Sequence, residues 1–232
     1  MHFFNESLTT FVIVFATLFP VVNPPGIAPI FLNLTEACSP AIRNALARKA
    51  SINSFLMLFG AMVIGPRVLI FFGISVPVLK IAGGLVVAAM GWKLLNQKSN
   101  SVEDYGGITR MTDETSAGSS FYPLTLPLTV GPGAIATMIA LVAGMNFTTD
   151  TVTETQVATV VGALMGIFAI SLSVFIAFRG APNARRILGV NGTNVMMRLF
   201  AFILFTIGVQ IVADGIYGLI AYVYQTLPAV KL

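Results

Sequence analysis

Two short stretches of the chain combine residue types that could bind a small ligand inside an otherwise apolar sequence. They contain Asn23, Pro24, Pro25 and Gly26 in the first stretch, and Thr129, Gly131, Pro132 and Gly133 in the second. A proline lacks the backbone N–H and its ring clashes with the preceding helical turn, so each stretch predicts a helix that is interrupted there. The glycine that follows each proline permits backbone conformations closed to other residues.

A broken helix exposes backbone groups that a continuous helix would satisfy. The free N–H groups where the helix restarts, at the positive end of its dipole, favour an anion such as a carboxylate. The carbonyls that end the preceding segment, with the side-chain oxygens of Asn23 and Thr129, could face a cationic ammonium group. We expect Asn23, and either Thr129 or Gly131, to act as N-caps. The pattern favours a small zwitterion as ligand; the alternative is a pair of tightly packed kinks that bind nothing.

One further acid is placed deep in an apolar segment. Asp214 follows Gln210 by four residues, so the two side chains lie on the same face of a helix. An ionisable residue within a membrane span predicts a functional role, here coupling to protons or sodium. The alternative is that Asp214 caps a local structure or lies among lipid headgroups. Lys80 is expected to extend its ammonium group toward the headgroups.

The composition determines which elements position these residues. The 232 residues are 56% hydrophobic and 9% charged, against about 25% charged residues in soluble domains, and this indicates a polytopic all-α membrane protein. A polar stretch over residues 96–120 is expected to be a flexible linker between residues 1–95 and 121–232. The six predicted spans are Leu8–Leu34, Ala50–Phe72, Val76–Leu95, Phe121–Gly144, Val157–Phe178 and Val195–Tyr222.

The basic residues predict the topology. With six spans, ten of the 13 Lys and Arg residues fall on one side, which the positive-inside rule makes cytoplasmic. Residues 96–120 would then be cytoplasmic, and both termini would face outward. If residues 8–34 instead enter the membrane and return on the same side, all later spans would have the opposite orientation.

The two stretches also belong to an internal repeat. Residues 20–26 and 127–133 share the pattern P-x4-P-G, and two further proline or glycine patterns match in the same order, around Pro66 and Pro182 and around Gly91 and Gly208. Each half would hold three spans, and an odd number makes the second copy inverted in the membrane. Inverted repeats are characteristic of secondary transporters, whose sites lie between the halves near the bilayer midplane. The two breaks are therefore expected to face each other.

The same residues argue against several other functions. A single cysteine, Cys38, and a single histidine, His2, exclude an internal disulfide and leave no Cys/His cluster for a metal. The apolar segments hold no triad-like set and too few acids for a metal site, so no enzyme activity and no cofactor are expected. The net charge of +4 relates to topology and the lipid bilayer rather than to nucleic acid. An oligomer is compatible with this composition.

Four segments of the chain resemble the signature regions of the MarC family of integral membrane proteins, which includes the SnatA transporters. They are "NPPGIAPIFLNLT", "GISVPVLKIAGGLVVAAMGWKLL", "PLTLPLTVGPGAIATMI" and "MRLFAFILFTIGVQIVADGI". The resemblance implies six spans in the bacterial inner membrane and transport of small neutral amino acids such as glycine and alanine. It also implies functional positions at Asn23, Pro24, Pro25 and Gly26 and at Gly131, Pro132 and Gly133.

The sequence thus predicts a secondary transporter of small neutral amino acids that works by alternating access and is coupled to H⁺ or Na⁺. One alternative is an exporter of amphiphilic drugs or metabolites, which predicts a larger apolar cavity. Another is a structural or interaction protein, which predicts normal assembly without flux.

Overall fold

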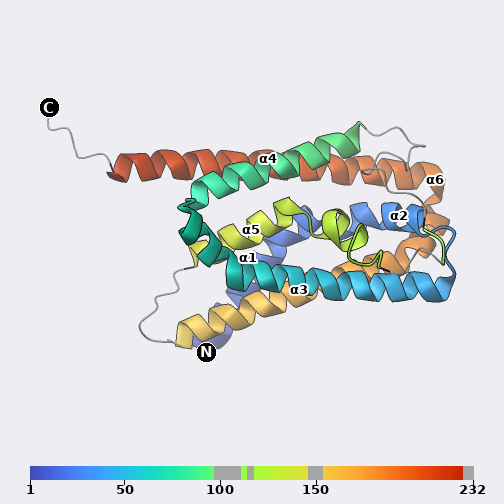
Figure 1. Ribbon diagram of the computed structural model, residues 1–232, viewed down its shortest axis with the longest axis horizontal. Helices are drawn as coiled ribbons and strands as arrows, with labels where there is room; N and C mark the ends of the chain where they lie inside the picture. The colour runs from blue at the N-terminus through green and yellow to red at the C-terminus, as the bar shows by residue number, and fades with distance from the viewer. Residues whose placement is uncertain (97–110, 114–117, 146–153, 227–232) are drawn as a thin grey trace.

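A computed structural model describes residues 1–96, 111–113, 118–145 and 154–226 of the chain, and every regular element in these ranges is helical. Most of the predicted linker 96–120 lies outside the described residues. The elements in chain order (Figure 1) are α1 (His2–Val22), α2 (Pro24–Leu34), α3 (Pro40–Phe72), α4 (Val76–Leu95), the π-helical segment η2 (Leu124–Thr129), α5 (Pro132–Gly144) and α6 (Glu154–Thr226).

Proline and capping residues determine where most of these helices begin. In each of α2, α3, α4 and α5 a proline occupies one of the first two helical positions, where its missing N–H has no helical partner to lose and its φ angle suits the helix. Helix α3 ends where Gly73 adopts a φ of 64° and the backbone N–H of Ile74 bonds to the carbonyl of Leu69 at 2.9 Å. This left-handed turn satisfies carbonyls that the last helical turn leaves free.

Within the residues that the structure describes, five helical stretches are long and apolar enough to cross a membrane. By residue range they are His2–Leu34, Pro40–Phe72, Val76–Leu95, Glu154–Ile187 and Asn191–Tyr224. Large apolar side chains such as Ile70 and Phe71, 81% and 83% exposed, suit contact with lipid and not with water. The predicted span Phe121–Gly144 contains two short helical pieces, η2 and the 13-residue α5. The chain is therefore a helical membrane protein.

The helices extend beyond the predicted apolar segments. Helix α3 begins at Pro40, ten residues before the predicted start of its span. The polar stretch between Phe178 and Val195 is helical as well, except at Gly189, where a φ of 66° and a ψ of −179° separate the two helices that make up α6. Hydropathy marks the part of a helix that suits lipid, whereas the backbone hydrogen bonds continue into the polar flanks.

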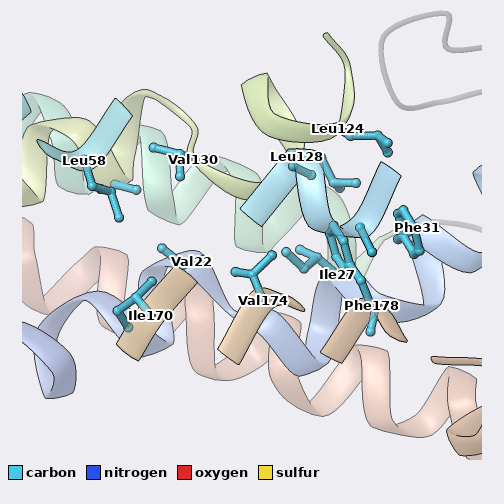
Figure 2. Close-up of a cluster of buried hydrophobic side chains, with 14 of the residues drawn as sticks. Val22, Ile27, Phe31, Leu58, Leu124, Leu128, Val130, Ile170, Val174 and Phe178 are labelled. Atoms are coloured by element: carbon cyan, nitrogen blue, oxygen red, sulfur yellow. The ribbon is translucent and has the colours of Figure 1, made fainter. Parts of the chain in front are cut away.

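A core of buried apolar side chains joins α1, α2 and the first part of α6 to α3, η2 and the residues between η2 and α5 (Figure 2). Phe31 of α2 and Phe178 of α6 stack with ring centroids 4.1 Å apart and planes 2° apart. Val22 and Val130, which border the two breaks, are 1% and 0% exposed. Each break therefore lies against packed protein. Irregular backbone within a membrane is tolerated only when it is buried in protein or lines a cavity.

Helix α4 and the last part of α6 lie side by side (Figure 1) and meet through small residues. A Cβ atom added to Gly84 would lie 2.7 Å from the backbone N of Val212, and one added to Gly91 would lie 2.4 Å from that of Phe205. A Cβ on Gly208 would lie 2.3 Å from the backbone N of Ala88. We call Gly84, Gly91 and Gly208 the glycine seam. Here the two backbones approach as closely as glycine alone allows.

Candidate functional site

The first break is a single residue. Asn23 adopts the left-handed conformation, with φ 51° and ψ 57°, and ends α1 while it caps α2. Its side-chain Oδ1 accepts a hydrogen bond from the backbone N–H of Gly26 at 3.1 Å. Asparagine suits this position because it tolerates left-handed backbone and is among the best N-cap residues. Asn23 thus fills the cap role that the sequence predicts.

The prolines after Asn23 leave carbonyl groups of α1 without their usual partners. A helical carbonyl accepts from the N–H four residues later, and for Pro20 and Val21 those residues are Pro24 and Pro25, which have no N–H. The end of α1 therefore presents backbone acceptors at the break. The carbonyl of Phe19, by contrast, accepts from the N–H of Asn23 at 2.8 Å.

The second break is built differently. Helix α5 begins at Pro132 with Gly131 as its N-cap, and no side chain caps it. Thr129, the other expected cap, instead donates its hydroxyl to the carbonyl of Leu124 within η2 at 2.6 Å. The N–H groups of Gly133 and Ala134, in the first turn of α5, have no partner within the helix. The two restarts thus differ, since α2 is capped by an amide side chain and the first turn of α5 is not.

One cavity of about 330 Å³ brings the two breaks together. Asn23 contributes from the first break, and Thr129, Gly131, Pro132 and Gly133 contribute from the second. We call this space the break cavity. The rest of its lining is mostly apolar and comes from the end of α1, from α2, η2 and α4, and from Tyr122 and Leu204. Its volume lies near the lower end of the range for small-molecule sites.

Asn23, one of the residues that line this cavity, carries a side-chain donor without a partner. The residue is 4% exposed, and its side-chain Nδ2 is buried without a hydrogen-bond partner. The cap bond identifies the other side-chain atom as the oxygen, because only an acceptor can pair with the Gly26 N–H. A buried donor without a partner is unfavourable by about 1–3 kcal/mol. A ligand that supplies an acceptor at this point removes that penalty.

The remaining predicted site residues lie elsewhere. Pro24 and Pro25 line a different cavity of about 390 Å³, on the side of the break that faces α6. Gly26 has its Cα held against the Asn23 side chain, and a Cβ there would lie 2.3 Å from Nδ2. Asp214 is exposed, accepts a hydrogen bond from Gln210 Nε2 at 2.8 Å, and lines a third cavity of about 410 Å³.

Sequence reasoning missed the residues of α4 at this site. Val87 lines the break cavity, and its Cγ2 atom would lie 2.3 Å from a Cβ added to Gly133. Met90 also lines the cavity, and its Sδ would lie 3.6 Å from a Cβ added to Gly131. Nothing in the local pattern of α4 distinguishes these apolar residues from others that face lipid. Only the packing of α4 against α5 identifies them.

Comparison with known proteins gives a consistent result over nearly the whole chain. The model of a family described as MarC family integral membrane protein matches residues 8–220. The UPF0056 membrane protein YvbG of Bacillus subtilis strain 168 is 34% identical over 206 residues, which is 89% of this chain and 93% of that protein. The UPF0056 inner membrane protein MarC of Escherichia coli strain K12 is 32% identical over 206 residues, or 88% and 92%. No solved structure matches the chain.

Proposed function

The chain belongs to the MarC family of integral membrane proteins, and we propose that it is a secondary transporter of small neutral amino acids, such as glycine and alanine, in the bacterial inner membrane. The observation that carries the proposal is the unpartnered Nδ2 of Asn23, at the same cavity as the first turn of α5. The relatives named as inner membrane proteins support the location.

The donors and acceptors at the break cavity match the two ends of a zwitterion. The substrate carboxylate would accept hydrogen bonds from Asn23 Nδ2 and from the first-turn N–H groups of α5, whose dipole also favours an anion. The substrate ammonium would donate to the carbonyl of Val21, which Pro25 leaves without its helical partner, and Val21 lines the cavity. This arrangement reverses the expectation for Asn23, since its oxygen serves as the cap and its nitrogen is left for the ligand.

Transport requires that the site be reached from either face, and we propose six crossings arranged as two inverted three-helix repeats. Supporting contacts pair α1 and α2 with α6, and η2 and α5 with α3. The two long helices α3 and α6 meet where Ser51 Oγ donates to the Ser171 carbonyl at 2.5 Å. These serines begin similar stretches, "SINSFLMLFGA" and "SLSVFIAFRGA", at an offset of 120 residues.

The coupling ion is proposed to be H⁺ or Na⁺, with Asp214 and its partner Gln210 as the groups that take it up. Because Asp214 lines a cavity other than the break cavity, the coupling would act through helix movement and not by contact between ion and substrate at the breaks. Uptake by an Asp214→Asn variant that keeps its full dependence on a proton gradient would remove this role.

The proposal is tested with purified protein in liposomes. Uptake of labelled glycine and alanine is measured with imposed proton or sodium gradients, against liposomes without protein. We expect uptake that depends on one of the gradients and is inhibited by the unlabelled amino acids. No uptake of either amino acid under any gradient, by protein shown to be folded, would contradict the proposal. Flux of an amphiphilic dye in its place would favour the drug exporter.

A further inference from the structure

The third cavity, which we call the charged cavity, lies end to end with the break cavity along the same helices. On α4 the break cavity is lined from Val86 to Leu94, and the charged cavity from Leu79 to Gly83. On α5 the break cavity is lined up to Ala134, and the charged cavity from Ala136 onward. Helix α1 lines both in the same manner, with Val21 and Val22 at one and Ile13 and Thr17 at the other.

A tight contact between α4 and α5 separates the two cavities. A Cβ added to Gly83 would lie 2.6 Å from the Cβ of Ala136, one helical turn from the contact between Val87 and Gly133. The two contacts bring α4 and α5 together with no space for a ligand between them.

Two opposite charges line the charged cavity. Lys80 projects from α4, and Asp214 from the last part of α6. In the described part of the chain, the structure records no ion pair between them. Two unpaired opposite charges at one cavity, within segments that are otherwise apolar, can bind the two ends of a zwitterion at once. Two threonines, Thr17 and Thr137, add hydroxyl oxygens to the lining.

We propose that the charged cavity is a second binding site for the zwitterionic substrate, with Asp214 for its ammonium group and Lys80 for its carboxylate. The proposal rests on the proposed function and adds to it a site at the opposite end of the path, which the substrate occupies before or after the break cavity. It agrees with a coupling role for Asp214, because a carboxylate that holds H⁺ or Na⁺ in the absence of substrate would exchange that cation for the ammonium group.

The test compares glycine transport from the two membrane faces, in right-side-out and inside-out vesicles. We expect Lys80→Gln and Asp214→Asn each to raise KM for glycine roughly three- to tenfold at one face, the same face for both, and less than twofold at the other. This range corresponds to the loss of one partly exposed charge contact. Arg67→Gln is the control, because Arg67 is exposed and lines none of the three cavities, and we expect its KM to be unchanged at both faces.

Exchanging the charges at positions 80 and 214 tests whether the two charges act on the substrate together. The double variant Lys80→Asp, Asp214→Lys keeps both charges in the cavity, and we expect it to recover KM to within threefold of the intact chain. If the intact chain transports glycine and KM is unchanged at both faces in Lys80→Gln and in Asp214→Asn, the second site is overturned and the proposed function still stands. Absence of wild-type transport would instead refute the proposed function. Equal changes at both faces would indicate a general structural effect and would also overturn the proposal.

Discussion

The substitution Asn23→Asp tests the break cavity with little disturbance of the fold. Aspartate keeps an oxygen at the position that accepts from the Gly26 N–H at 3.1 Å, tolerates the left-handed backbone, and is as good an N-cap as asparagine. The substitution puts a carboxylate oxygen in place of the Nδ2 donor, which is buried without a hydrogen-bond partner. Burial of a carboxylate at a position 4% exposed is unfavourable, but the Gly26 N–H and the positive end of the α2 dipole offset part of that cost, so we expect the variant to fold with a melting temperature in detergent lowered by several degrees.

Ligand affinity should change much more than stability. A hydrogen bond from a neutral donor to a charged acceptor contributes about 1.5–3 kcal/mol, so its loss weakens binding about 10- to 150-fold. Repulsion between the new carboxylate and that of the substrate adds to this at pH 8, where a carboxyl group at a helix N-terminus is ionised. We expect binding of glycine, measured by isothermal titration calorimetry, and uptake in liposomes to fall by at least tenfold.

The matched control is Asn33→Asp. Asn33 lies on α2, as Gly26 does, but does not line the break cavity. Its Oδ1 accepts a hydrogen bond from Arg185 at 3.3 Å. The chemical change is identical, and glycine affinity should not change. If Asn23→Asp remains folded and binds glycine as tightly as the intact chain, then Nδ2 does not bind the carboxylate and the reasoning is refuted.

Three further predictions concern helix packing and the burial of Cys38. Gly133→Ala places a methyl group against Val87, so it should lower uptake severalfold. Adding Val87→Ala makes space for this methyl group and should restore uptake. Uptake that stays low in the double variant would contradict the packing argument. In thermal unfolding, Gly84→Ala should lower the free energy of unfolding by about 1–3 kcal/mol. Gly60→Ala is the control, because a Cβ atom there has no neighbour within 4 Å. It should be neutral or stabilising by up to about 1 kcal/mol. Burial raises the pKa of the Cys38 thiol, so less thiolate is present at neutral pH, and maleimide labelling should be slower than for free cysteine and should accelerate as pH rises; labelling as fast as free cysteine at pH 7 would refute this.

The sequence was sufficient to locate both helix breaks, because proline and glycine act on the local backbone. The interruption at Asn23 and the restart at Pro132 lie where the patterns indicate. Local chemistry could not show that Pro24 and Pro25 line a different cavity from Asn23, since this depends on how α2 packs against α6. It also could not show which amide atom of Asn23 is free, because that follows from a single cap bond in the folded chain.

The predicted linker, residues 96–120, illustrates a different limit. Composition predicts a solvated segment, yet Met111 is 4% exposed and its backbone N–H bonds to the Leu34 carbonyl at 2.9 Å. The Cys38 thiol donates to the Met111 carbonyl at 3.4 Å. Leu34 and Cys38 lie 77 and 73 residues earlier in the chain, so no window of local sequence contains this contact. The short stretch 111–113 packs there because the turn after α2 offers it a free carbonyl and an apolar surface.

The glycine seam between α4 and α6 has a consequence for any survey of mutational tolerance in this protein. Gly84, Gly91 and Gly208 contact backbone and line none of the three cavities described above, yet replacement by a residue larger than alanine should abolish activity. In a saturation library these positions would have scores indistinguishable from those of ligand-binding residues. Gly60 and Gly180, with open space around them, would be silent. Loss of activity on substitution would therefore mark the contact between α4 and α6 as strongly as it marks a ligand site. Ligand-binding residues would be distinguished by loss of activity on isosteric exchange, as we expect for Asn23.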